Sequence, residues 1–315
     1  MAHQRGTTKP RRARVLSVPP SKWPALAKRV VTEAAHDRVT MIAASLAFHG
    51  FLALLPILIA AVGLLGLVGL SSSTLHTLLH ATNVLLPAQM SQVLNAQLLK
   101  PASNRVNIVE LVVGVAVALW SSIEAMSALQ VALDVAYEVP RDRGFFGRRL
   151  VAIPLIGVTL LLGGVASVLL VLGTPLAELL PSAFALVKPE FHAILLFIRY
   201  GGSLVLVMLL LSAYYSFGVA RPKSSWEWVS PGSVVAAVGW VVAAGSFSFY
   251  LDHFAHETRT YGALAGVAVT LLWMFLTGVV ILFGAELNRE FERMGEADAA
   301  APPASGDAAA EAPSL

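Results

Sequence analysis

Residues 41–70 read MIAASLAFHGFLALLPILIAAVGLLGLVGL, thirty consecutive residues without a formal charge. The hydrocarbon core of a bilayer is about 30 Å thick, and about 20 apolar residues in a helix are enough to cross it. The segment is too long, and begins too far along the chain, for a cleaved signal peptide. It therefore predicts a helix that crosses a membrane and stays in it.

Further charge-poor runs of similar length follow the first one and predict five more spanning helices. The sequence thus predicts an all-α fold, a polytopic membrane helix bundle with six transmembrane helices. The runs after the first are Val106–Met126, Leu150–Gly173, Ala193–Gly218, Val229–Leu251 and Gly262–Gly284.

The composition supports a membrane protein and excludes several kinds of site. Hydrophobic residues make up 57% of the 315 residues and charged residues only 13%, whereas an ordinary soluble domain has about 25% charged residues. The chain has no cysteine. Disulfides, thiolate metal sites and a cysteine nucleophile are therefore excluded.

The distribution of lysine and arginine predicts the orientation in the membrane. With the N-terminus inside, the cytoplasmic side receives 17 of these residues and the other side four. Both termini are therefore expected in the cytoplasm. The net charge of +3 divides into +7 over residues 1–40 and −4 over the rest of the chain. Because the positive charge belongs to a leader and not to a domain, no nucleic-acid partner is expected.

The pattern outside the spans predicts four parts of the chain. Residues 1–20 form a basic disordered leader, and residues 21–40 an amphipathic helix whose cations face anionic headgroups of the inner leaflet. An ordinary solvated helix is the alternative for residues 21–40. Residues 41–290 form the transmembrane domain, with short amphipathic helices at its interfaces, and residues 291–315 a disordered Ala/Pro/acidic tail. In the loop 71–105, two short amphipathic helices either cover an external cavity or pack on the bundle.

Charged residues inside spans are costly, so each is a candidate for function. Glu110 lies near the start of the second predicted span and Arg199 near the start of the fourth, at similar depth. Either the two side chains form an ion pair between helices, or Arg199 faces a cavity and binds an anionic headgroup.

Two further acids lie near the predicted cytoplasmic ends of spans. Glu124, in the second span, either belongs to a polar path or reaches the interface as a solvated acid. Glu286, in the sixth, either has a structural or gating role or forms a solvated salt bridge with Arg289 or Arg293, three and seven residues later. Helix breaks are common around transporter sites, and the candidate break or gating positions are Pro56 and Gly262.

No pattern in the sequence predicts catalysis, a cofactor or a metal site. The histidine groups lack a defined set of ligands for a metal. Neither a phosphate-binding glycine loop nor a serine nucleophile elbow is present. We therefore expect no enzyme, and in particular no nuclease. The histidine groups are His76 with His80, and Asp252, His253, His256 and Glu257.

The chain carries several short motifs along its predicted helices: Ala44–Ala47 with Pro56, Leu119–Ser121, Ala128–Leu129, Ser230–Gly232, Phe247–Tyr250, Thr260–Gly266, Leu272–Trp273 and Gly284–Asn288. These motifs resemble those of the YihY/virulence factor BrkB family of bacterial inner-membrane proteins, formerly labelled ribonuclease BN. The resemblance implies a six-helix inner-membrane fold and a role in transport or envelope maintenance. The sequence departs from the family pattern at Phe48, His49 and Ala53.

These observations lead to one functional hypothesis and one alternative. The hypothesis is an inner-membrane transporter, or flippase-like handler, of an amphiphilic envelope component such as a lipid or glycolipid. Its expected partners are membrane lipids, and anionic headgroups at the basic N-terminal segment. The alternative is an envelope scaffold that binds other proteins and transports nothing.

Overall fold

The computed structural model describes residue 21 and residues 23–67, 108–170, 189–221, 229–254 and 263–300, and all regular structure in them is helical. The elements are α1 (Trp23–His36), α2 (Val39–Leu67), α5 (Ile108–Ala136), α6 (Gly144–Val158), the π-helix η3 (Thr159–Gly163), α8 (Pro189–Ala213), the π-helix η4 (Tyr214–Gly218), α9 (Pro231–Phe254) and α10 (Ala263–Ala300).

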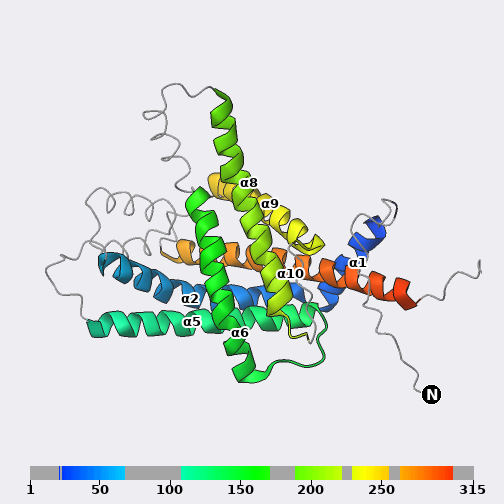
Figure 1. The fold of residues 1–315 in the computed structure, drawn as a ribbon, viewed down its shortest axis with the longest axis horizontal. Coiled ribbons are helices and arrows are strands. Elements are labelled where there is room, and N and C mark those ends of the chain that lie inside the picture. The colour runs from blue at the N-terminus through cyan, green and yellow to red at the C-terminus, as the bar shows by residue number, and fades with distance from the viewer. Residues whose placement is uncertain are drawn as a thin grey trace, which may run out of the picture.

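The helices form two sets that cross (Figure 1). Helices α2, α5 and α10 run along the long axis of the molecule, and α2 packs against both of the others. Helices α6 and α8 run steeply across this set, while α9 packs against α10 and α8. Helix α1 meets α2 at a bend of 63°.

In the described part of the chain, five helices are long and apolar enough to cross a membrane, or six if the bent α1–α2 pair counts as one span. The prediction of an all-helical polytopic bundle is therefore confirmed. The orientation of the termini stays a prediction. The five helices are Val112–Ala136, Gly144–Leu170, Leu196–Gly218, Pro231–Leu251 and Gly266–Ala297.

The buried core lies towards one end of the bundle, where the helices converge. This is the end that the basic residues assign to the cytoplasm. The middle and opposite parts of several helices expose large apolar side chains, as expected of surfaces that face lipid. Core residues include Val39, Ala43, Ala132, Leu133, Leu155, Tyr215, Ala237 and Leu282, and exposed apolar residues include Val112, Val113, Leu160, Leu161, Phe197 and Phe249.

Two prolines lie inside helices without ending them. Helix α2 continues through Pro56, so the predicted break does not interrupt the helix there, and α6 continues through Pro154. The π-helix η3 begins five residues after Pro154, and its Thr159 hydroxyl lies 2.7 Å from the Tyr214 hydroxyl at the start of η4. The two π-helical stretches therefore contact each other inside the bundle.

Helices α9 and α10 meet through two of the motifs noted in the sequence. The Gly232 N–H donates to Oδ1 of Asn288 (2.7 Å), and Nδ2 of Asn288 donates to the Ser230 hydroxyl (3.0 Å). A Cβ atom on Gly232 would collide with the carbonyl oxygen of Gly284. The glycines thus let the two backbones touch, as small residues do in membrane helix pairs.

Helix α1 lies within the segment 21–40, where the sequence predicts an amphipathic helix. Its buried residues Leu26 and Val30 pack on Leu287 and Phe291 of α10, so part of the apolar stripe contacts protein. Helix α10 continues to Ala300. The predicted start of a disordered tail at residue 291 is therefore wrong, because Phe291 belongs to this packing.

The α9–α10 crossing predicts that alanine lowers the melting temperature at one glycine of α9 but not at another. Gly232→Ala is expected to lower the melting temperature of the purified protein by about 5 °C or more, because the methyl group must force the helices apart. Gly245→Ala is the control, since a Cβ there meets nothing within 4 Å. Equal melting temperatures for the two variants in detergent would contradict the close crossing.

Candidate functional site

A groove of about 570 Å³ lies between α2, α5 and α6. Apolar side chains form much of its wall, and polar and charged side chains come from all three helices. The apolar residues are Met41, Ile42, Leu46, Ala128, Val131, Ala132, Val135 and Phe145, and the others are Ser45, His49, Glu124, Ser127, Arg148 and Arg149.

An ion pair between Glu124 and Arg149 lies in the wall of this groove. The Arg149 guanidinium stacks on Phe145, with its carbon 3.4 Å from the ring centroid, and lies 5.6 Å from the centroid of Trp120. Both charged side chains are partly exposed, at 21% for Arg149 and 37% for Glu124. The pair is therefore held by aromatic packing but remains within reach of a ligand in the groove.

The segment before α6 holds the second arginine of the groove in place. Asp142 accepts a hydrogen bond from the Gly144 N–H (2.9 Å) and from Nε of Arg148 (2.8 Å). These hydrogen bonds and the charge of Arg148 hold the pKa of Asp142 below its ordinary value. Arg148 and Arg149 therefore each have a carboxylate partner.

Arg143 joins the same segment to the end of η4. Its guanidinium donates to the carbonyl oxygens of Gly218 (2.7 Å) and Val219 (2.6 Å). It also donates to Gln130 (3.3 Å), whose amide donates to the carbonyl of Arg148 (3.0 Å). The start of α6 is thereby fixed against α5 and the end of η4.

The structure gives Arg199 a backbone partner. Its Nε and Nη2 donate to the carbonyl oxygen of Leu170, at 3.0 and 2.6 Å, in the helical stretch that continues η3. Glu110 is on the first turn of α5, but its side chain is outside the described residues. Gly262, the other candidate break position, is also outside the described residues. The Glu110–Arg199 pair therefore stays a prediction, while the observed bonds join Arg199 of α8 to the backbone of the helix that continues η3.

Glu286 is buried, and neither arginine on its own helix pairs with it. It is 2% exposed, and its Oε1 has no hydrogen-bond partner. Arg293 instead binds Glu33 (3.0 Å), Glu290 (2.5 Å) and Glu138. The solvated salt bridge considered for Glu286 is therefore wrong, because Arg293 is directed to α1 and to the end of α5.

Glu138 has an unusual backbone conformation for a residue with a side chain. Its φ is 52°, a left-handed value that favours glycine. The Val139 N–H bonds the Asp134 carbonyl (2.9 Å) and the Glu138 N–H bonds the Val135 carbonyl (2.8 Å). This geometry ends α5 and directs the Glu138 carboxylate to the arginines of α10.

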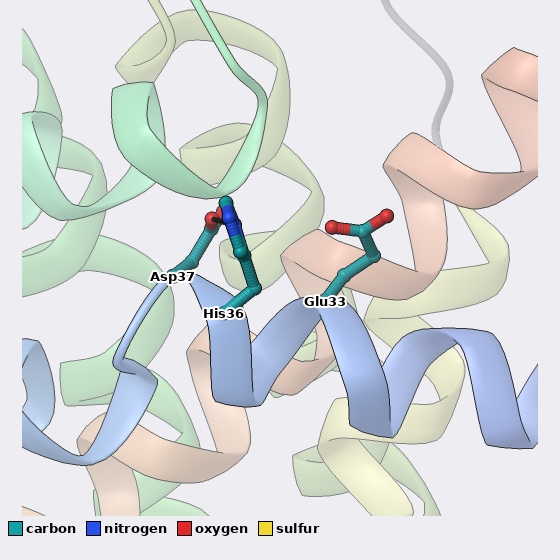
Figure 2. Close-up of side chains that lie close together, drawn as sticks. All are labelled: Glu33, His36 and Asp37. Carbon is teal, nitrogen blue, oxygen red and sulfur yellow. Dashed lines mark hydrogen bonds and ion pairs between the residues drawn. The ribbon is translucent and has the colours of Figure 1, made fainter.

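Three potential metal ligands lie together at the bend between α1 and α2. Figure 2 shows His36 and Asp37 with their tips adjacent, and Glu33 one turn earlier and directed towards α10. His36 Nδ1 lies 3.2 Å from Asp37 Oδ1. One ligand atom from each of the three residues lies within 4.8 Å of the others. None of the three belongs to the histidine groups named from the sequence. Of those groups only His253 has a described side chain, which is bonded to the Phe249 carbonyl (2.9 Å).

The groove predicts energetic coupling between Glu124 and Arg149. Glu124→Gln and Arg149→Gln are each expected to lower the melting temperature, and the double variant to lose less than the sum, because the second change no longer breaks a pair. Glu124→Gln combined with Arg29→Gln, an exposed arginine of α1, is the additive control. Additive losses for Glu124 and Arg149 in a thermal-shift assay would exclude the ion pair.

The Glu138 contacts predict a pH-dependent effect. Burial acts to raise the pKa of Glu138, but hydrogen bonds and charges of Arg293 and Arg289 hold it below its ordinary value of 4.5. The stabilisation is therefore present above about pH 4.5 and lost as the pH falls through the lowered pKa. Glu138→Gln is expected to lower the melting temperature at pH 7, and its difference from the unmodified protein should shrink only as the pH falls below about 4.5. A constant difference from pH 7 to pH 3.5 would contradict the assignment.

Comparison with known proteins identifies the family. The model of the virulence factor BrkB family matches residues 30–308. The putative ribonuclease-like protein YfkH of Bacillus subtilis (strain 168) is 34% identical over 175 residues, 56% of this chain and 63% of YfkH. A UPF0761 membrane protein of Paraburkholderia xenovorans (strain LB400) is 25% identical over 261 residues, 82% of this chain and 58% of that protein.

The matches span less than two thirds of the length of these relatives. No solved structure matches the chain. The family match begins in α1 and includes all the helices that the structure describes after it, with the groove and the α9–α10 crossing. The chain belongs to the virulence factor BrkB family.

Proposed function

We propose that this protein moves or accommodates an amphiphilic component of the bacterial envelope, a lipid or glycolipid, in the inner membrane. The observation that carries the proposal is the groove between α2, α5 and α6. Its apolar wall suits an acyl chain, and the Glu124–Arg149 pair with Arg148 suits a polar headgroup. Ligand sites of this kind combine apolar walls with a few polar groups that fix orientation.

The position of the groove supports a lipid at the inner leaflet. Met41 of α2 and Phe145 of α6, both lining residues, are near the starts of their helices. The distribution of basic residues assigns these helix starts to the cytoplasmic side. With both termini in the cytoplasm, the charged part of the groove lies at headgroup depth, and the exposed apolar sides of the helices face the acyl chains.

We further propose that the protein is not an enzyme. Most polar side chains of the groove have a partner in the protein: Glu124 and Arg149 pair with each other, and Arg148 pairs with Asp142. Nδ1 of His49 lies 2.9 Å from the Ser45 carbonyl and the Ser127 hydroxyl donates to the Ile123 carbonyl (2.7 Å). These contacts give no nucleophile activated by a base among the described lining residues. The relative YfkH is named a ribonuclease-like protein, but that name describes YfkH and gives no reaction for the groove of this protein.

A lipid-scrambling assay in proteoliposomes tests the function. The purified protein is reconstituted with a fluorescent phospholipid, and dithionite bleaches the label in the outer leaflet. The unmodified protein is expected to expose the inner-leaflet label, whereas Arg149→Gln should reduce the rate at least about tenfold, because it removes one of the two groove cations that a headgroup phosphate would bind. Arg29→Gln removes the same charge outside the groove and is expected to retain the rate.

Two results would contradict the proposal. One is a rate for the unmodified protein equal to that of empty liposomes, with no lipid retained in native mass spectrometry. The other is equal rates and equal lipid retention for the unmodified protein and Arg149→Gln. The first result, with a stoichiometric protein partner found by crosslinking in cells, would favour the scaffold.

A further inference from the structure

The charged side chains at the groove between α2, α5 and α6 have both signs. Arg148 and Arg149 are cations in its wall, and Glu124 is an anion. Arg149 pairs with Glu124, and Arg148 pairs with Asp142, which precedes α6. The two positive and two negative charges of these pairs cancel. A ligand without net charge would therefore leave the balance of the groove unchanged.

Glu124 satisfies the Arg149 guanidinium only in part. Nη2 of Arg149 donates to the Glu124 carboxylate, and Nη1 donates to the Phe145 carbonyl (3.3 Å). Nε is buried and has no hydrogen-bond partner among the described residues. Nε and Nη2 lie on one edge of a guanidinium, and such an edge can form two parallel hydrogen bonds with a phosphate. A phosphate in place of the carboxylate can therefore use a donor that Glu124 leaves unbonded.

Aromatic packing holds Arg149 independently of Glu124. The guanidinium carbon lies 3.4 Å from the centroid of the Phe145 ring, and this stacking does not involve the carboxylate. Glu124 is the more exposed partner, at 37% against 21%. In the part of the chain that the structure describes, its Oε2 accepts no hydrogen bond. Glu124 can therefore turn towards a ligand while Arg149 stays in the wall.

The Glu124–Arg149 pair discriminates between kinds of ligand charge. An anion bound to Arg149 would leave the Glu124 carboxylate without its cation and close to a second negative charge. A cation bound to Glu124 would leave Arg149 unpaired in the same way. Removing one partner of an ion pair away from bulk water is unfavourable. A ligand with both charges avoids this cost, because it can replace both partners at once.

We propose that the groove selects a zwitterionic headgroup that carries a phosphate and a primary ammonium group. The phosphate binds Arg149, and the ammonium binds Glu124. A primary ammonium has several N–H donors and no acceptor, so it suits a carboxylate. The inference rests on the proposed function, because it names the headgroup of the amphiphile whose acyl chains the apolar wall would hold.

Binding of lipids that share acyl chains but differ in headgroup tests the selectivity. Phosphatidylethanolamine has both charges, phosphatidylglycerol has no amine, and N-acetyl-phosphatidylethanolamine has its amine converted to a neutral amide. Dissociation constants are measured by native mass spectrometry of the purified full-length protein in detergent. The unmodified protein is expected to bind phosphatidylethanolamine at least about tenfold more tightly than either other lipid, because only its ammonium can pair with Glu124.

Glu124→Gln is expected to change the affinities in opposite directions. It should weaken phosphatidylethanolamine about tenfold, because the ammonium loses its anionic partner, and should strengthen phosphatidylglycerol, because the repelling charge is gone. A partly unfolded variant would instead bind both lipids less tightly. Glu296→Gln removes an exposed acid of α10 outside the groove and is the matched control that should keep the preference.

The inference is overturned if the unmodified protein binds the lipids equally or prefers phosphatidylglycerol. It is also overturned if Glu124→Gln weakens both phospholipids to the same extent. If binding without preference is still weakened by Arg149→Gln, only the headgroup inference fails and the proposed function stands. Retention of no lipid by the unmodified protein would overturn both. If Glu124→Gln does not fold, the comparison of the lipids on the unmodified protein decides the outcome.

Discussion

The direct contact between the backbones of α9 and α10 fixes the rotation of α10, on which much of the described core depends. Gly232 and Gly284 let the helices touch, and Asn288 bonds the start of α9. Successive residues of a helix are 100° apart, so fixing Gly284 against α9 also fixes the directions in which the other residues of α10 point. Gly278 packs against Ala43 of α2, and the Tyr215 hydroxyl donates to the Ile281 carbonyl (2.8 Å). A bulkier residue at the crossing would turn or displace all of these contacts together.

Arginines in this protein donate hydrogen bonds to backbone carbonyl groups as well as to carboxylates. Carbonyl groups at helix ends lack partners within the helix and are costly to leave unpaired in a membrane. Arg143 binds the carbonyls of Gly218 and Val219, and Arg199 binds that of Leu170. A planar guanidinium with several donors can satisfy two acceptors at once. The sparse charges of the sequence therefore include Arg143, which pairs with the carbonyl groups at the end of η4.

The sequence predicted the helices better than the site, for physical reasons. Charge-poor runs give the spans directly, because the cost of burying charge in lipid acts on every residue of a run. The groove depends on which faces of α2, α5 and α6 meet, and a uniformly apolar helix carries no pattern that gives its rotation. Arg148 and Arg149 were interpreted only as orientation signals, although one of them pairs with the predicted site residue Glu124. The Glu110–Arg199 pair stays a prediction, because the Glu110 side chain lies outside the described residues.

The left-handed backbone at Glu138 has a consequence for stabilising the protein. A glycine there would relax the φ of 52° and is the substitution that a search for backbone strain would select first. It would also delete the carboxylate that reaches Arg289 and Arg293, and so release the end of α5 from α10. The substitution would improve the geometry of the helix end, but it would also loosen the end of the bundle where the groove lies.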